Sequence, residues 1–279
     1  MKVEDFNTKT TPNWCPGCGD YGILNALKTA LTELNIERKN TVLVSGIGCA
    51  SKIPQWVNVF GFHTLHGRLL PVATGVKLGN KDLTVIAAGG DGDSLGIGLS
   101  HFVHSCRRNI DLTTIIFDNA VYGLTTGQTS PTSQKGFVSK STPFGSIESP
   151  VNPVSLAIAS GATFVARGFA GDVKHLSGLI VEAIKHKGFS VIDVLQPCVS
   201  FNHVNTYDFY SKRVYKIEKT QDKFEAFKKS FEFEEKIPIG IFFEENRETL
   251  IDQMPQLNGA PLSGRSIEVD LKNLFERFV

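Results

Sequence analysis

Hydrophobic residues recur along the chain with two spacings, one helical and one typical of buried strands. Between residues 22 and 35 the apolar side chains follow a helical spacing, which predicts a helix with one buried face. Short apolar runs rich in β-branched residues occupy 41–47, 83–88, 112–117 and 190–195 and predict buried strands. Helical segments separate these runs. The alternation predicts an α/β fold, a mainly parallel sheet with helices on both faces, whose ligands bind beyond the carboxyl ends of the strands.

The second half of the chain adds a long polar segment and a less regular end. Residues 125–153 are rich in Thr, Ser, Pro and Gly, and so long a loop in a compact domain is typical of a functional segment, such as a lid over the site. We expect one domain over 1–210 and a C-terminal extension over 211–279 that packs on it. Within the extension, a helix over 222–232 would place three phenylalanines on one face: Phe224, Phe227 and Phe231.

Composition and charge exclude several classes of protein. The 29 Lys and Arg against 28 Asp and Glu give a formal net charge of +1, which argues against general binding to nucleic acid or to a membrane surface. The first residues lack the apolar core of a signal peptide, and no apolar run is long enough to span a bilayer. We therefore expect a soluble cytoplasmic protein. Five cysteines, an odd number, do not suit a disulfide framework in a chain of 279 residues.

Acidic and amide side chains directly follow two of the predicted strands. Gly90-Asp91-Gly92-Asp93 comes after one strand, and Asp118-Asn119 with Val121 comes after the next. A carboxylate and an amide oxygen from neighbouring turns can hold one Mg²⁺, while glycines let the backbone approach a diphosphate. Two unrelated turns would explain the residues less well than this spacing does. The pattern is that of thiamine-diphosphate enzymes, in which we expect Asp91, Asn119 and the Val121 carbonyl to hold Mg²⁺.

Four of the cysteines also lie where predicted loops meet the same sheet edge. Cys15 and Cys18 form a CxxC pair, and Cys49 and Cys198 each follow a predicted strand. Four thiolates of this kind are typical of a zinc site or an iron–sulfur cluster, and a CxxC pair alone also suits a redox disulfide. Their position beside the expected thiamine site favours an iron–sulfur cluster. Cys106, within a predicted helix, is better explained as a small buried hydrophobic residue.

In these segments the sequence resembles the β subunits of the 2-oxoacid:ferredoxin oxidoreductases. The resemblance covers about residues 14–202, with a weaker match over 237–247. It is carried by motifs that occur in the family's order: WCPGCGDYGIL, SGIGCASK, HTLHGRLLPVATGVKLGN, GGDGDSLGIG, RRNIDLTTIIFDNAVYGLTTGQTSPTS and QPC. Each motif alone is unspecific, but the set is specific.

The resemblance implies cofactors, a reaction and partners. It implies a thiamine-diphosphate-binding fold and one [4Fe-4S] cluster on Cys15, Cys18, Cys49 and Cys198. It also implies the coenzyme A-dependent oxidative decarboxylation of pyruvate, 2-oxobutyrate or 2-oxoglutarate to an acyl-CoA and CO₂, with electrons passed to ferredoxin. The thiamine reacts, so no side-chain nucleophile is expected. The residues expected around thiamine diphosphate are Ile47, Gly48, Cys49, Ala50, His66, Gly92, Asp93, Gly123 and Leu124.

Two residues are candidates for contact with the substrate, and one departure from the family bears on its identity. Lys52 and Leu124 are the candidates, although Lys52 is nearly as well explained as a solvated lysine, and His66 as a hydrogen-bonded structural histidine. Many broad-specificity members have LTKGQ where this chain has LTTGQ, with Thr126 in place of the lysine. If that lysine binds a second carboxylate, its absence favours pyruvate or 2-oxobutyrate over 2-oxoglutarate.

A missing residue type points to a partner chain. Thiamine enzymes ordinarily place a glutamate against the pyrimidine ring, yet no glutamate occurs between Glu37 and Glu148. We therefore expect a larger α, or fused γα, subunit to supply it, in a heterodimer that is inactive without that subunit. Ferredoxin, as an acidic partner, would dock on a local basic patch. The candidates for that patch are Lys9, Lys52, Arg107, Arg108, Lys212 and Arg213.

Two other functions are also compatible with parts of the sequence. A non-oxidative thiamine enzyme, a decarboxylase or synthase, would explain the aspartate motif but would leave four cysteines without a role. A zinc-stabilised binding module would explain the CxxC pair but not the Mg²⁺ spacing. The iron content of the anaerobically purified protein distinguishes these hypotheses, because only the oxidoreductase requires about four irons per chain.

Overall fold

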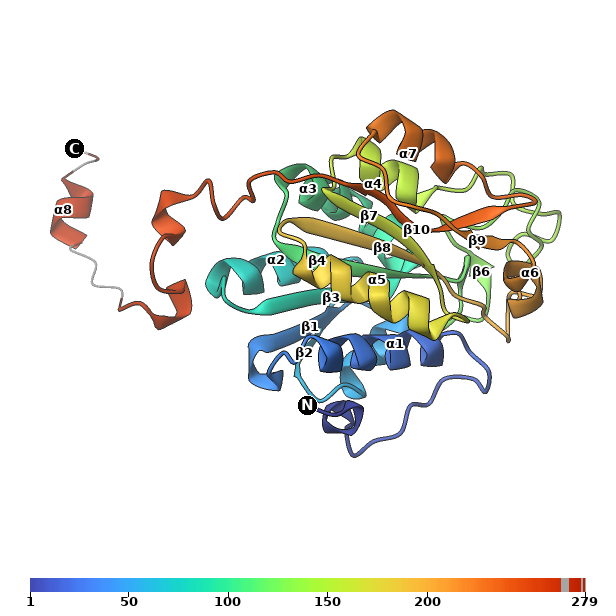
Figure 1. Ribbon diagram of the computed structural model, residues 1–279, viewed down its shortest axis with the longest axis horizontal. Coiled ribbons are helices and arrows are strands. Elements are labelled where there is room, and N and C mark those ends of the chain that lie inside the picture. The colour runs from blue at the N-terminus through green and yellow to red at the C-terminus, as the bar shows by residue number, and fades with distance from the viewer. Residues whose placement is uncertain (267–270, 277, 279) are drawn as a thin grey trace.

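One central sheet organises the computed structural model, which describes residues 1–266, 271–276 and 278 (Figure 1). Its strand order is β2-β1-β3-β4-β8-β7-β10-β9, and neighbouring strands are parallel except for the antiparallel pair β7 and β10. The strands are β1 (Thr41–Ser45), β2 (Phe60–His63), β3 (Thr84–Gly90), β4 (Leu112–Asp118), β7 (Phe164–Phe169), β8 (Phe189–Leu195), β9 (Val214–Lys216) and β10 (Ile237–Glu244). A separate two-stranded ribbon joins β5 (Val121–Tyr122) to β6 (Gln128–Thr129).

Helices cover both faces of this sheet. One face carries α1 (Asp20–Glu33) and α5 (Val173–Lys185), and the other carries α2 (Leu69–Gly79), α3 (Leu99–Arg108), α4 (Pro153–Ala159) and α7 (Lys223–Ser230). The short helices are α6 (Tyr207–Ser211), α8 (Leu271–Phe275), η1 (Val3–Phe6), η2 (Arg38–Asn40), η3 (Ala50–Gln55), η4 (Gly92–Ile97), η5 (Pro255–Leu257) and η6 (Leu262–Gly264).

The inner strands are buried on both faces, which explains their continuous apolar runs. In β1, Leu43 packs in the hydrophobic cluster beneath α1 and α5, whereas Val42 and Val44 pack in the cluster on the opposite face. A strand with two buried faces needs apolar side chains at every position and not at alternate ones. The predicted α/β architecture, mainly parallel with helices on both faces, is therefore confirmed.

Some elements differ from what the hydrophobic pattern suggests. The pattern does not predict β2, whose four residues are all exposed at the edge of the sheet, or α2, which contains Pro71 and Gly75. The three phenylalanines of 222–232 do share a face, but it is the outer face of α7. Phe224 is 86% exposed, and the helix buries the small residues Ala226 and Ser230 instead.

The C-terminal part of the chain contributes to the same sheet. Strand β10 pairs with β7, β9 pairs with β10, and α7 packs against α4. Beyond these elements, the last described segments extend away from the body in Figure 1. The division of the chain after residue 210 remains a proposal. Within the described part of the chain, no helix has both the length and the apolar character needed to cross a bilayer.

Candidate functional site

Four loops that follow strands meet at the carboxyl edge of the sheet. They are the turn 46–49 after β1, residues 91–93 after β3, residues 119–123 after β4 and residues 196–198 after β8. Two cavities lie among them. We call one the aspartate cavity and the other the cysteine cavity, after the side chains that characterise each.

The aspartate cavity has a volume of about 230 Å³. Its lining includes every residue that the sequence predicts to contact thiamine diphosphate or Mg²⁺, so the fold brings these chain-distant candidates together. The lining residues are Ile47, Gly48, Cys49, Ala50, His66, Gly90, Asp91, Gly92, Asp93, Asn119, Val121, Tyr122, Gly123, Leu124 and Thr125.

Asp91 is held by hydroxyl groups from the long polar loop. Its Oδ2 accepts hydrogen bonds from Ser130 Oγ at 2.5 Å and Thr132 Oγ1 at 2.6 Å, and the residue is 1% exposed. Burial raises the pKa of Asp91 to about 6, and the two hydroxyls oppose that rise. Sequence reasoning missed Ser130 and Thr132. The beginning of the 125–153 loop thus holds Asp91 with two hydroxyl groups, and the lid that the sequence suggests stays a prediction.

Asp93 connects three separate turns. Its Oδ1 accepts hydrogen bonds from the backbone N–H of Ile47 at 3.0 Å and of Gly67 at 2.7 Å, and lies 2.8 Å from His66 Nδ1. Its Oδ2 is buried without a hydrogen-bond partner among the described residues. A Cβ at Gly46 would lie only 1.8 Å from Oδ2, so this close approach requires glycine.

The turn after β4 contains a residue with an unusual backbone conformation, and hydrogen bonds hold its polar side chains in place. Ala120 adopts a φ of 56°, which is unusual for a residue with a side chain and is typical of functional turns. Asn119 Oδ1 accepts the N–H of Val121 at 3.1 Å, and Tyr122 donates its hydroxyl to the Gly92 carbonyl at 3.3 Å. The ring of Tyr122 would clash with any side chain at Gly92. The turn after β4 therefore packs closely against the turn that carries Asp91.

The cysteine cavity has a volume of about 220 Å³ and is lined by Cys15, Cys18, Cys49 and Cys198. Trp14 donates its indole N–H to the Cys49 carbonyl at 2.7 Å, and Gln196 donates an amide hydrogen to Cys18 Sγ at 3.3 Å. Burial raises the pKa of Cys49 to about 11 and also raises the pKa values of Cys18 and Cys198. Cys106 is buried in the core, away from this lining, as expected.

A buried carboxylate lies against the same cysteines. Asp20 is fully buried, and neither of its carboxylate oxygens has a hydrogen-bond partner among the described residues. Burial raises its pKa to about 7, an effect that Cys18 and Lys52 oppose. Sequence reasoning missed Asp20, although its place two residues after Cys18 was a signal. Lys52 lines the cysteine cavity and not the aspartate cavity, and its Nζ donates to Asn13 Oδ1 at 3.2 Å.

Four residues line both cavities and form the wall between them: Cys49, Asn119, Gly123 and Leu124. A Cβ at Gly123 would lie 3.6 Å from Cys49 Sγ and 3.9 Å from Cys198 Sγ, so two of the sulfurs lie directly beside this glycine. Within residues 1–266, 271–276 and 278, no three His, Cys, Asp or Glu side chains converge closely enough to bind a single metal ion. The cysteines instead surround a cavity.

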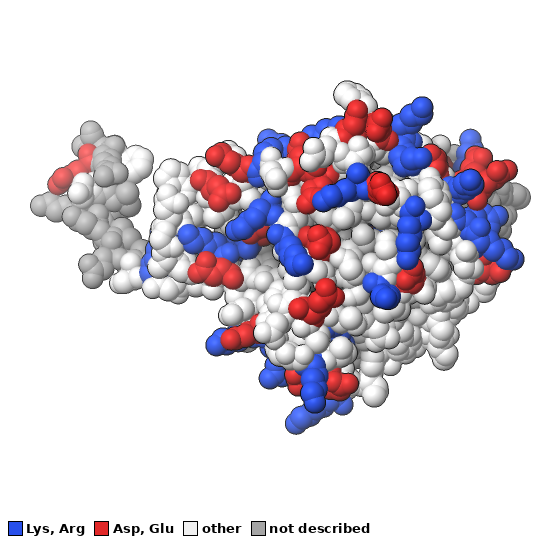
Figure 2. Space-filling view, in the orientation of Figure 1, with Lys and Arg blue, Asp and Glu red and all other residues white. Residues whose placement is uncertain are grey.

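The six basic residues proposed for a partner's docking do not form one patch. Arg107 and Arg108 end α3 beside the start of β4, at the opposite edge of the sheet from the cysteines, so their assignment was wrong. Lys212 is paired with Asp208 at 2.7 Å. Figure 2 shows basic and acidic side chains interspersed over the face it presents, in keeping with the near-neutral total charge.

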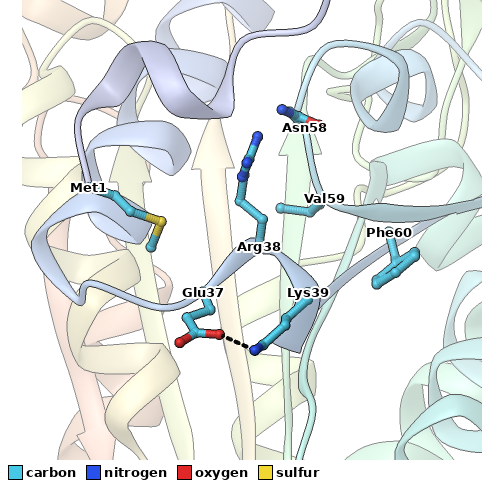
Figure 3. A pocket seen from close by; sticks show the side chains of 7 residues that line it. All are labelled: Met1, Glu37, Arg38, Lys39, Asn58, Val59 and Phe60. Carbon is cyan, nitrogen blue, oxygen red and sulfur yellow. Dashed lines mark ion pairs between the residues drawn. The ribbon is translucent and has the colours of Figure 1, made fainter.

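A hollow of about 520 Å³ lies away from this edge (Figure 3). It is formed at the amino ends of β1 and β2 by Met1, Glu37, Arg38, Lys39, Asn58, Val59 and Phe60. Lys39 and Glu37 pair with each other at 2.9 Å. Since ligands of parallel sheets bind at the carboxyl edge, its size does not make it the functional site.

Comparisons with known proteins agree with this geometry. Residues 46–194 match the family model for the C-terminal thiamine pyrophosphate-binding domain of thiamine pyrophosphate enzymes, and residues 198–259 match the model for the C-terminal part of the pyruvate ferredoxin oxidoreductase β subunit. The first model covers both turns that carry the Mg²⁺ candidates. The second begins at Cys198.

Curated relatives and a solved structure extend the match to nearly the whole chain. The β subunit of a Sulfolobus sp. 2-oxoacid:ferredoxin oxidoreductase is 53% identical over 248 residues, 83% of this chain and 81% of that protein. The β subunit of 2-oxoacid:ferredoxin oxidoreductase 1 of Aeropyrum pernix is 44% identical over 310 residues, 99% and 96% of the two chains.

The solved structure is a 2-oxoglutarate:ferredoxin oxidoreductase from Magnetococcus marinus with 2-oxoglutarate, coenzyme A and succinyl-CoA bound. It superposes with a TM-score of 0.93 at 37% identity and covers 99% of this chain and 96% of that one. Family models, relatives and fold thus agree. The chain belongs to the family of 2-oxoacid:ferredoxin oxidoreductase β subunits, with their thiamine-diphosphate-binding fold.

Proposed function

We propose that this β subunit, with its partner subunit, catalyses the coenzyme A-dependent oxidative decarboxylation of a 2-oxoacid to an acyl-CoA and CO₂ and passes the electrons through a [4Fe-4S] cluster to ferredoxin. The observation that carries the proposal is the shared wall of the two cavities. Cys49 lines both cavities, and Gly123 separates the aspartate cavity from two cysteine sulfurs. Electrons released in one cavity therefore have a short route to the other.

The aspartate cavity fits thiamine diphosphate and Mg²⁺. Asp91, Asn119 and Val121 line it together, and their carboxylate, amide and carbonyl oxygens are the ligand types that Mg²⁺ prefers. In the proposal these three residues hold Mg²⁺, and the glycines beside them admit the diphosphate. Thiamine diphosphate supplies the carbon nucleophile that attacks the 2-oxoacid, while this chain anchors and orients the cofactor.

The cysteine cavity fits a [4Fe-4S] cluster. Four thiols around an enclosed space are the donor set of such a cluster, whereas one tetrahedral zinc ion needs four sulfurs about 2.3 Å from a single point. The described cysteines surround a cavity of about 220 Å³. This arrangement supports the cluster over the zinc-stabilised module. In the proposal Cys15, Cys18, Cys49 and Cys198 bind the cluster.

The activating glutamate comes from a larger partner subunit in this proposal. No glutamate is among the residues that line the aspartate cavity. Apolar side chains are exposed close to its opening, with Leu65 at 76%, Ile97 at 54% and Leu124 at 49%. Exposed apolar groups of this kind are typical of a protein interface. We therefore place the partner over this opening, where its glutamate would meet the cofactor.

The substrate in this proposal is a 2-oxoacid with one carboxylate, pyruvate or 2-oxobutyrate, in preference to 2-oxoglutarate. Thr126 lines the cysteine cavity, and Leu124 lines both cavities. Neither side chain offers a positive charge for a second carboxylate. Replacing Thr126 with lysine is expected to increase the kcat/KM for 2-oxoglutarate relative to pyruvate, and an unchanged ratio would contradict this assignment.

The test is anaerobic purification of the chain with and without its partner subunit. We expect about four irons per chain and a broad absorbance near 400 nm. With thiamine diphosphate, Mg²⁺ and coenzyme A, the complex should reduce ferredoxin or a viologen when a 2-oxoacid is added, whereas this chain alone should not. A colourless protein containing zinc would overturn the proposal. CO₂ release without electron transfer would instead support a non-oxidative thiamine enzyme.

A further inference from the structure

His66 is the titratable side chain in the lining of the aspartate cavity to which the proposed function assigns no proton transfer or metal. The other titratable groups in the lining each have an assignment. Asp91 faces Mg²⁺, Cys49 faces the cluster, Asp93 is engaged by three donors, and the Tyr122 hydroxyl donates to the Gly92 carbonyl. Burial also raises the pKa of Tyr122, so the phenol keeps its proton. The imidazole of His66 remains as an unassigned base at this site.

Asp93 fixes which nitrogen of His66 carries the hydrogen. Asp93 Oδ1 already accepts the N–H groups of Ile47 and Gly67, so it acts as an acceptor toward His66 Nδ1, 2.8 Å away. Nδ1 is therefore the donor, and in the neutral ring Nε2 carries the free lone pair. Nε2 has no hydrogen-bond partner among the described residues.

The position of the ring suits proton exchange with solvent and with a second substrate. In the chain without its partner subunit the His66 side chain is 39% exposed, whereas the Asp93 carboxylate that orients it is 1% exposed. The ring also meets the edge of Tyr122, with 6.2 Å between ring centroids. An imidazole held on one side by a buried carboxylate and open on the other is the arrangement of an oriented general base.

We propose that His66 is the base that removes the thiol proton of coenzyme A when the acyl group is transferred. This inference rests on the proposed function, because it assumes the thioester-forming step. The S–H bond breaks and its proton moves to Nε2, while the sulfur keeps the electron pair and forms the C–S bond of the thioester. The bond between the acyl carbon and the cofactor would break in the same transfer, and its electron pair would return to the cofactor. The imidazolium then releases the proton to solvent through its exposed edge. The proton transfer moves no electrons, and those of the oxidation go to the cluster.

The test separates the steps before and after coenzyme A enters. In the anaerobic complex with its partner subunit, the cluster absorbance is followed after mixing with pyruvate alone, and then with pyruvate and coenzyme A. His66→Gln should slow the coenzyme A-dependent phase by roughly 10²-fold, and this slowing should exceed any change in the coenzyme A-independent phase by at least about tenfold. The matched control is His63→Gln, three residues away on exposed β2, which should change neither phase.

The pH profile gives a second readout. Only a neutral imidazole accepts a proton, so the coenzyme A-dependent rate of the wild type should increase with pH and then level off. The titratable and charged groups around the ring are Asp93 on η4, Tyr122 on β5 and Arg68 in its own turn. His66→Gln should abolish the rise, whereas His63→Gln should keep it.

A third readout does not depend on activity. Diethyl pyrocarbonate modifies exposed imidazoles, and peptide mass spectrometry reports each histidine separately. Coenzyme A should protect His66 in the complex and leave His63 as reactive as before. Equal slowing of both kinetic phases in His66→Gln, no slowing of either, or no protection by coenzyme A would overturn the assignment. A wild-type complex whose cluster does not respond to any 2-oxoacid would overturn the proposed function itself.

Discussion

The two cavities at the carboxyl edge of the sheet are nearly equal in size but hold their ionisable groups differently. In the aspartate cavity, Asp91 accepts two hydroxyl hydrogen bonds and Asp93 is contacted by three donors. In the cysteine cavity, burial dominates and raises the pKa values of Cys18, Cys49 and Cys198. The first site has its carboxylates oriented by the fold. The second contains thiols whose protons, in the proposed function, are released when the cluster binds.

The two sites therefore differ in how much they depend on supporting residues from other parts of the chain. A carboxylate that holds Mg²⁺ has to be kept in one orientation, so the aspartate cavity relies on hydroxyls and glycines contributed by distant segments. Thiolates are bound tightly enough by iron to be ordered by the cluster itself. Changes in the support of the two sites should therefore have unequal effects.

The largest expected effect is the loss of one cluster ligand. Cys198→Ala should lose most of its iron and its absorbance near 400 nm, because a [4Fe-4S] cluster requires four protein ligands. Thiamine diphosphate binding should remain within roughly threefold of the wild type, since Cys198 lines only the cysteine cavity. Iron analysis and titration with the cofactor measure the two properties. Cys106→Ala is the control, and full iron content in Cys198→Ala would remove that residue from the ligand set.

The next effect compares two glycines, Gly46 beside Asp93 and Gly123 in the shared wall. Gly46→Ala would bring a Cβ within 1.8 Å of Asp93 Oδ2, whereas Gly123→Ala would make only ordinary contacts at 3.6 and 3.9 Å. We expect Gly46→Ala to lower the free energy of unfolding by about 3 kcal/mol or more and Gly123→Ala by less than about 1 kcal/mol. Thermal unfolding measures both. Equal stability of the two variants would mean that the aspartate cavity is not the more constrained of the two.

A smaller effect is expected from the hydroxyl that supports Asp91. Thr132→Val keeps the shape of the side chain but removes a donor that lies 2.6 Å from both Asp91 and Asp118. The affinity for Mg²⁺ and thiamine diphosphate should fall roughly 10–100-fold, as is typical when a group that orients a metal ligand is removed. Iron content should not change. Thr74→Val on α2, outside both cavity linings, serves as the control, and unchanged cofactor affinity in Thr132→Val would argue against support by the loop.

The smallest effect concerns pH and cluster assembly. The pKa of Cys49 is raised to about 11, so its thiol is protonated at neutral pH in the cluster-free chain, and binding of the cluster releases that proton. Reconstitution with iron and sulfide should therefore become more complete as pH rises from about 7 to 9. Absorbance near 400 nm in a buffer series gives the measurement. Cofactor binding in the aspartate cavity should vary less over this range, because the pKa of Asp91, at about 6, lies below it.

Much of the site could be predicted from the sequence because of one property of parallel sheets. The carboxyl ends of all parallel strands lie at one edge, so the residues that directly follow β1, β3, β4 and β8 lie on the same side of the sheet, and these four strands are neighbours in the strand order. That is why Asp91, Asn119 and Cys49 line shared cavities despite their separation in the chain. The sequence assigned the glycines of these turns to a bound diphosphate, which stays a prediction, whereas the structure shows that Gly46 makes room for Asp93 and Gly92 for Tyr122.

Other features could not be predicted from the residues that are adjacent in the sequence. Ser130 and Thr132 lie in a polar loop whose sequence does not indicate which carboxylate they contact. The apolar face of α7 points outward although its spacing suits a buried helix, and only the packing of Ala226 against the body shows this. Arg107 and Arg108 are the last residues of α3, which ends at the opposite edge of the sheet, and this separates them from the cysteines.

By itself, then, the sequence determined which chemical groups this protein brings to one edge of a parallel sheet, because strand ends and tight turns are encoded by neighbouring residues. The tertiary structure alone decided how those groups are divided. It placed Lys52 beside the cysteines, brought Asp93 against His66, and made Cys49 and Gly123 the wall between two cavities. These relations depend on strand order and on the packing of loops that are distant in the chain, and no local pattern specifies them.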